Sequence, residues 1–400
     1  MCHSYTSGPL PEGILNSLVL SPVYPFDSPS SPSAVSDMPA YPFFDPETEG
    51  LVYRVTSNTH MYQESLSDVT SEAESAISGL TIQSDDLHEY FVEHHGRQHP
   101  AGESAVRWFP SDNTRRYILR HVLNKYLYGR NYFGPVGEIL RFAPGRRYKV
   151  LELGTRDGTW IQEMATEFPH VQFRSLDIVP IIAHAPRPNI VFEAYDFTRG
   201  LLQEDSSQDI VFLNVAMELV KDYRALLLEA HRVLKPGGLI HIREYNLQLW
   251  DPQDPSEPVG GANPASSRLI STARRALSKS GVDPDICDRL PQWLTPNSDL
   301  WKHLGPNQAR GFERISSTTR VFPAYPHERH ACSFKIDPFM VSIMAHYVVM
   351  TVRDMYGILR DGGLEVDEAN GLIDAMVEEL KNPEKCMLAK LHCTYAMKKS

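Results

Sequence analysis

The residues best suited to hold a ligand follow an apolar segment that predicts a buried strand. In Val150-Leu-Glu-Leu-Gly-Thr-Arg-Asp-Gly158, the acidic Glu152 comes just before two glycines, Gly154 and Gly158. Asp177 lies 19 residues after Gly158, at the end of the next predicted strand. In doubly wound sheets, ligands bind beyond the carboxyl ends of the strands. Glycines there allow the backbone to approach the ligand closely, and a carboxylate accepts hydrogen bonds from ribose hydroxyls. The spacing therefore predicts a nucleoside site.

The glycine loop differs from that of dinucleotide-binding proteins. The fingerprint G-x-G-x-x-G is absent, because Gly154 and Gly158 are four residues apart with Arg156 between them. We therefore expect no cradle for a pyrophosphate, and an NAD-linked dehydrogenase is disfavoured.

Two later features agree with a nucleoside ligand. Asp196, in Tyr195-Asp-Phe197, follows a third predicted strand and can place a carboxylate at an adenine amino group. Val233-Leu-Lys-Pro-Gly-Gly-Leu-Ile240 ends a helix through glycines and turns directly into a strand, so its role is structural.

Taken together, these motifs resemble the class I S-adenosylmethionine-dependent methyltransferases. Within them the sequence is similar to the fungal LaeA-like group, through segments 109–115, 163–169 and 220–223 and Gly311-Phe312. The resemblance implies S-adenosyl-L-methionine as cofactor. The cofactor-binding residues that we assign are Glu152, Gly154, Arg156, Gly158, Asp177, Asp196 and Asn214.

Arg156 departs from the family pattern, in which the loop usually reads Gly-x-Gly-x-Gly. An arginine there has two alternative effects. It fills part of the pocket, where glycine normally allows close backbone approach. Alternatively it points outward and pairs with Asp157 or with the carboxylate of the ligand.

The reaction implied by the resemblance is in-line displacement at the methyl carbon of a sulfonium, which depends mainly on positioning. A general base is needed only for a poorly ionised acceptor such as a hydroxyl. Glu218 and Glu244 follow the fourth and fifth predicted strands and are the candidate catalytic residues, although each is also consistent with a solvated loop carboxylate.

The elements that position these residues alternate between strands and helices. We predict strands at 148–153, 172–176, 190–194, 210–214 and 239–244, and helices from about 112 and at 136–142, 159–168, 222–234, 267–280, 339–359 and 365–380. This order predicts an α/β fold: a doubly wound, Rossmann-like, mostly parallel seven-stranded sheet. A helical cover is inserted before the last strands, 312–322 and 389–397.

Composition divides the chain into three parts. Residues 1–100 contain 14 acidic residues against two basic ones, and the remainder contains 36 acidic and 37 basic residues, so the net charge of −11 belongs to the N-terminal part. Residues 1–50 contain nine Pro and nine Ser, a composition typical of disorder. We predict a disordered acidic leader at 1–100, a cofactor-binding core at 101–250, and the cover with the final strands at 251–400.

Other classes of site and partner are not expected. The near-neutral core argues against direct nucleic-acid binding, and no apolar segment reaches the ~20 residues of a membrane span. Five scattered cysteines and the lack of a secretory signal favour the cytoplasm, with the nucleus as an alternative. No metal site is predicted, because His88, His94, His95 and His99 lie in a polar linker without ligand spacing.

Two functions remain open. The first is methyl transfer from S-adenosyl-L-methionine to a small-molecule acceptor, at oxygen, in fungal secondary metabolism. The alternative is a LaeA-like regulator that acts through protein partners, with weak or no methyl transfer. Arg156 and the acidic leader, which offers a surface for a protein partner, are the features that motivate it.

Overall fold

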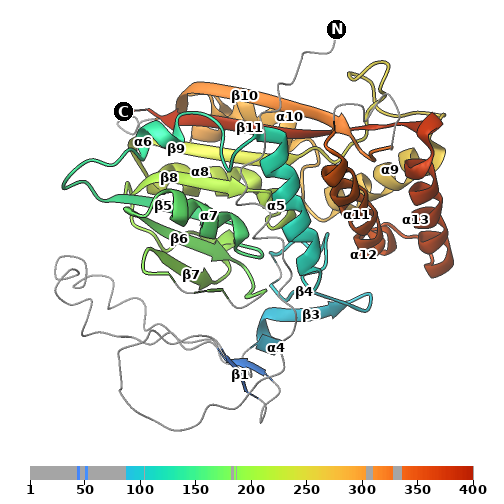
Figure 1. Ribbon diagram of the computed structural model, residues 1–400, viewed down its shortest axis with the longest axis horizontal. Helices are drawn as coiled ribbons and strands as arrows, with labels where there is room; N and C mark the ends of the chain where they lie inside the picture. The colour runs from blue at the N-terminus through green and yellow to red at the C-terminus, as the bar shows by residue number, and fades with distance from the viewer. Residues whose placement is uncertain are drawn as a thin grey trace.

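Among the described residues, seven strands form one central sheet (Figure 1). The computed structural model describes residues 43–45, 50–52, 87–102, 104–181, 184, 185, 187–302, 310–327 and 336–399. The strands are β5 (Tyr148–Leu153), β6 (Val171–Asp177), β7 (Ile190–Ala194), β8 (Gln208–Asn214), β9 (Leu234–Tyr245), β10 (Phe312–Pro323) and β11 (Leu388–Lys398). Their order is β10-β11-β9-β8-β5-β6-β7.

This topology confirms the predicted doubly wound sheet. The five strands from β5 to β9 pair in parallel, and β11 runs antiparallel between β9 and β10. The chain leaves β5 for β6 and β7 on one side and returns to β8 on the other. The boundary between β5 and β8 is therefore the switch point, and sheets of this type bind ligands at the carboxyl ends of the strands on either side of it.

Helices pack on both faces of the sheet because its central strands are buried on both sides. On one face, Val150 of β5 shares a buried cluster with Ile161 of helix α7 (Thr159–Glu167). On the other, Leu151 shares a second cluster with Leu227 of α8 (Tyr223–Val233). Helix α5 (Thr114–Tyr128) contacts α7, and the short α6 (Val136–Ile139) leads toward β5.

The predicted cover is present as five helices in the described part of residues 251–400. They are α9 (Pro264–Lys279), α10 (Ile286–Leu294), α11 (Pro338–Asp354), α12 (Tyr356–Asp361) and α13 (Val366–Lys381). Helix α10 was not predicted. The single helix predicted over 339–359 is two helices, α11 and α12, which join at Met355. Figure 1 shows α11, α12 and α13 grouped beside the sheet, next to α5.

Several described elements precede residue 101, the predicted start of the core. Helix α4 (Leu87–Tyr90) is followed by a hairpin of β3 (Phe91–His94) and β4 (Arg97–Pro100). Two short strands, β1 (Phe43–Asp45) and β2 (Gly50–Val52), pair with each other. The rest of the predicted leader lies outside the described residues. No helix in the described ranges is both long and apolar enough to cross a bilayer.

Candidate functional site

The loop after β5 turns sharply at the switch point. Gly154 has φ +99°, and a Cβ there would lie 3.0 Å from the carbonyl oxygen of Asn214, so both the backbone conformation and the space require glycine. The N–H groups of Gly154 and Thr155 both donate to the carbonyl of Leu176, at 2.8 and 3.1 Å. The loop is therefore held against the end of β6.

Glu152 is buried below this loop and joins three strands. Its carboxylate accepts hydrogen bonds from the Ser175 hydroxyl at 2.5 Å and from the Asn214 amide at 2.9 Å. Burial raises the pKa of Glu152 to about 8, although these two hydrogen bonds oppose the shift. The structure brings the predicted residues Glu152 and Asn214 together and adds Ser175, which sequence reasoning had missed.

Asp177 ends β6 with both carboxylate oxygens fixed by the backbone. One oxygen accepts from the N–H of Ile178 and the other from the N–H of Arg156, each at 2.8 Å. Arg156 reaches this position with φ +55°, in the left-handed region that non-glycine residues rarely adopt. Each oxygen keeps a second lone pair, so the oriented carboxylate is still able to accept from ligand hydroxyls.

Asp196 follows β7 and is partly exposed. It accepts hydrogen bonds from Thr198 and, at 2.9 Å, from the hydroxyl of Ser104. Burial alone raises the pKa of Asp196, but these hydrogen bonds outweigh it and lower the pKa below its usual value. Ser104 precedes α5, so the segment after the N-terminal hairpin reaches the edge of the sheet.

Glu218 is the centre of a buried ion cluster. The guanidinium of Arg120 donates to it at 2.7 Å, and those of Arg116 and Arg156 lie 3.5 Å away. Burial works to raise the pKa of Glu218, but the three arginines outweigh it and hold the pKa at about 2. A carboxylate this acidic is a weak base at neutral pH. Glu218 is thus a partner for arginines, where the sequence had suggested a general base or a solvated loop carboxylate.

The side chain of Arg156 points inward and belongs to this cluster. Its side chain is 6% exposed, and its guanidinium lies 5.2 Å from the ring centre of Tyr117 on α5, between Asp177 and Glu218. The side chain thus points toward these two carboxylates and not toward Asp157, which the sequence had offered as a partner.

Several buried donors in the cluster are unused. Within the described residues, Nε of Arg156 and all three guanidinium nitrogens of Arg116 make no well-directed hydrogen bond, although Arg116 lies within ion-pair distance of Glu218 and Asp354. On the acceptor side, Oε2 of Glu218 and Oδ1 of Asn214 also have no hydrogen-bond partner there. Buried polar atoms without partners are costly, so these atoms point to a missing polar ligand.

Glu244 has the opposite electrostatic state to Glu218. It is fully buried in β9 and accepts from the Tyr223 hydroxyl at 2.8 Å and from the Met217 N–H at 3.2 Å. Burial raises the pKa of Glu244 to about 8. The fold therefore favours the protonated form of this carboxyl.

Sequence reasoning missed the contribution of α5. Arg116 and Arg120 are one helical turn apart, so they share a face of α5, and both meet Glu218. This i, i+4 spacing is visible in the sequence, but the partner is 98 residues away from Arg120. Only the fold shows that these two cations are buried.

Comparisons with known proteins agree with this geometry. Residues 126–303 match a family described as a methyltransferase domain. The secondary metabolism regulator laeA of Coprinopsis cinerea is 25% identical over 311 residues, which cover 76% of this chain and 73% of that protein. Methyltransferase str2 of Strobilurus tenacellus is 23% identical over 158 residues, 39% of this chain and 54% of that protein.

Among solved structures, a phosphoethanolamine N-methyltransferase 2 of Haemonchus contortus in complex with S-adenosyl-L-methionine is 16% identical, with a TM-score of 0.38. The match covers 72% of this chain and 57% of that one, so the chain spans just over half of that enzyme and of str2. The family match and the sheet topology agree with each other. Residues 126–303 are similar to a methyltransferase domain, in a chain that is similar to the fungal LaeA-like proteins.

Proposed function

We propose that this protein binds S-adenosyl-L-methionine at the switch point and transfers its methyl group to an oxygen of a small-molecule acceptor. Two features around the glycine loop carry the proposal. Glu152 and Asp177 are oriented carboxylates, and buried guanidinium nitrogens of Arg116 and Arg156 make no well-directed hydrogen bond. When bound, the cofactor supplies a methyl group on a positively charged sulfur, an already activated leaving group.

The residues present fit this cofactor. Its amino acid end carries a carboxylate and an ammonium group, and the cluster offers unused donors on Arg116 and Arg156 and unused acceptors on Glu218 and Asn214. Asp177 is the acceptor that we assign to the ribose hydroxyls, and Asp196 the one for the adenine amino group. Gly154 and Gly158, both at positive φ, contribute no side chains two residues before and two residues after Arg156.

The two glutamates have different roles in this proposal. Glu218 orients Arg116, Arg120 and Arg156 and does not exchange a proton, because its pKa is about 2. Glu244, with its pKa near 8, is the general base for an acceptor hydroxyl. Its burial requires that the acceptor, or a water next to it, reaches Glu244 from the carboxyl end of β9.

Calorimetric titration with S-adenosylmethionine and S-adenosylhomocysteine tests the cofactor. We expect both compounds to bind the unsubstituted protein, called the parent below. Binding should be lost in the variant Asp177→Asn. Asp205→Asn is the matched control, because Asp205 is exposed and pairs only with Arg232 among the described residues. Lack of binding to the parent at millimolar ligand would refute the proposal.

Comparison of metabolites from cells that express the parent or Asp177→Asn tests the acceptor. We expect compounds that gain one CH₂ unit only with the parent. O-methylation is contradicted if the added methyl group is found on nitrogen or carbon.

A second function is favoured by one observation. Arg156 occupies the middle of the glycine loop with a buried side chain, and the relative from Coprinopsis cinerea carries the name of a regulator. The second candidate is a LaeA-like regulator that acts through protein partners, with weak or no methyl transfer. It is supported if Asp177→Asn abolishes cofactor binding but leaves the metabolite profile unchanged.

A further inference from the structure

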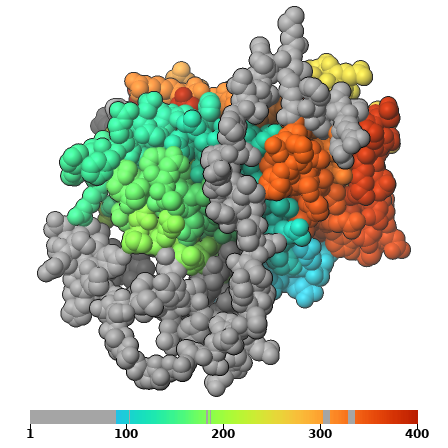
Figure 2. Space-filling view, viewed as in Figure 1, coloured from blue at the N-terminus to red at the C-terminus, as the bar shows by residue number. Residues whose placement is uncertain are grey.

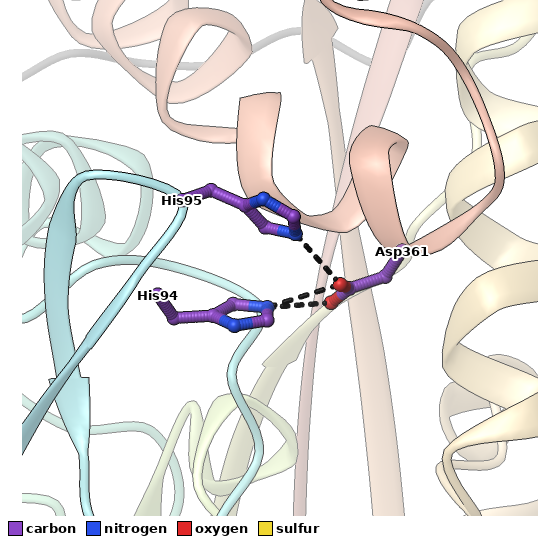
Figure 3. Close-up of side chains that lie close together, drawn as sticks. All are labelled: His94, His95 and Asp361. Atoms are coloured by element: carbon purple, nitrogen blue, oxygen red, sulfur yellow. Dashed lines mark hydrogen bonds and ion pairs between the residues drawn. The ribbon is translucent and has the colours of Figure 1, made fainter.

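Two histidines of the N-terminal hairpin and one aspartate of the cover meet at the surface (Figure 3). His94 ends β3, His95 lies in the turn before β4, and Asp361 ends α12. We propose that these three side chains form a binding site for a divalent transition-metal ion, of which zinc is the best match, and that the ion fastens the hairpin to the cover.

The geometry of the three side chains fits such an ion. Nε2 of His94 lies 3.0 Å from both carboxylate oxygens of Asp361, and Nε2 of His95 lies 2.9 Å from Oδ1. All three ligand atoms lie within 4.8 Å of one another. Ligands of a tetrahedral zinc ion, with bonds of about 2.0–2.1 Å, are about 3.3 Å apart. Small rotations of the side chains are enough to admit the ion.

The donor set selects the class of metal. Two imidazoles and one carboxylate suit zinc and related transition metals, whereas magnesium and calcium prefer ligand sets made only of oxygen. The side chains are 24%, 27% and 34% exposed, so an ion reaches them from solvent and water completes its coordination. This proposal is independent of the proposed methyl transfer.

A second observation points to a ligand at the same place. His94, His95 and His99 line a cavity of about 330 Å³, together with residues of α11, α12 and α13. His99 is 1% exposed, and its Nδ1 has no hydrogen-bond partner within the described residues. Its ring centre lies 5.5 Å from that of His94. The imidazole of His99 thus lies close to that of His94 and has a nitrogen without a hydrogen-bond partner among the described residues.

The ion would join parts of the chain that are far apart in sequence. His94 and Asp361 are separated by 267 residues, and Figure 2 shows the cyan hairpin region next to the orange and red helices of the cover. Asp354, just before α12, pairs with Arg116 of the buried cluster. A metal at Asp361 therefore stabilises the same junction between hairpin, cover and α5.

Zinc titration of the untagged full chain tests the site, with bound metal measured after gel filtration and affinity measured against a chromogenic chelator. We expect one equivalent of zinc on the parent, no response to magnesium, and a rise of the unfolding midpoint with zinc. Asp361→Asn and His94→Asn should each weaken zinc binding by about tenfold or more. Both residues lie at the surface, and circular dichroism without metal verifies that the variants fold.

Two control variants test whether zinc binds to histidines or carboxylates outside the cluster. His346→Asn removes a histidine of α11 outside the cluster, and Asp374→Asn removes a carboxylate that lines the same cavity. Both should bind zinc as the parent does. Absence of zinc binding by the parent, or binding that persists in either Asp361→Asn or His94→Asn, would overturn the proposal.

Discussion

The backbone N–H of Arg156 donates to the carboxylate of Asp177 at 2.8 Å. The residue that interrupts the glycine loop therefore also fixes the acidic side chain assigned to the ribose. Because this hydrogen bond comes from the backbone, a glycine at position 156 would preserve it. The guanidinium, by contrast, belongs to the cluster around Glu218. The two contributions of Arg156 are separable by mutation.

Arg156→Gly should weaken the binding of S-adenosylhomocysteine by about tenfold or more, because it removes a charged hydrogen-bond donor from the site. Arg156→Lys retains the positive charge and should lose less. Calorimetry measures both affinities. Tighter binding by Arg156→Gly would show instead that the side chain obstructs the pocket.

Glu218→Gln should lower the free energy of unfolding by about 3 kcal/mol, because three buried arginines lose their shared anion. The pKa of Glu218 is about 2 in the fold, against an ordinary value of 4.5. Its contribution to stability is therefore complete above pH 4.5 and is lost as the pH falls toward 2. Urea unfolding at several pH values measures this. An equal loss of stability by parent and variant over this range would contradict the assignment.

Comparison of the parent with Glu244→Gln should show the opposite dependence of stability on pH. The pKa of Glu244 is raised to about 8, so the folded state favours the protonated carboxyl. The parent should lose stability relative to the variant as the pH rises from about 4.5 through 8. Thermal unfolding across this range measures the difference. If Glu244 is also the general base, the variant loses the dependence of kcat on the ionisation of this group.

Gly158→Ala should cost more stability than Gly129→Ala, although both glycines have φ +73°. Alanine at either position adds about 1 kcal/mol of left-handed strain. At Gly158 its Cβ would also lie 2.5 Å from the ring of His184, whereas no atom lies within 4 Å at Gly129. The double variant Gly158→Ala/His184→Ala should recover part of the difference in urea unfolding. Equal losses in the two single variants would argue against the steric contact.

The sheet and its loop were predictable because their signals are local. Strand β7 was predicted at its exact bounds, and Glu152 and Asp177 lie at strand ends as their spacing indicated. Contacts across long sequence separations were not predictable. Asp361 is 266 residues from His95, and Ser104 is 92 residues from Asp196. Neither pair leaves a periodic pattern in the sequence.

Local sequence patterns were also unable to predict the environment of each carboxylate. Glu218 and Glu244 look alike in the sequence, as acidic residues at or just after the carboxyl ends of successive predicted strands. Their pKa values differ because Arg116, Arg120 and Arg156 outweigh the effect of burial on Glu218. Burial raises the pKa of Glu244 by more than the hydrogen bonds from a tyrosine hydroxyl and a backbone N–H lower it. Side chains on α5 and in the loop decide this difference, and their directions depend on packing.

The position of β11 has a consequence for biosynthesis. This strand, Leu388–Lys398, lies between β9 and β10, both of which precede it in the chain. While the ribosome is still producing residues before 388, β9 and β10 have no strand between them, and each exposes an unpaired edge. The nascent chain therefore cannot complete its sheet during most of translation. It depends on its late residues, or on a chaperone, to avoid pairing with neighbours.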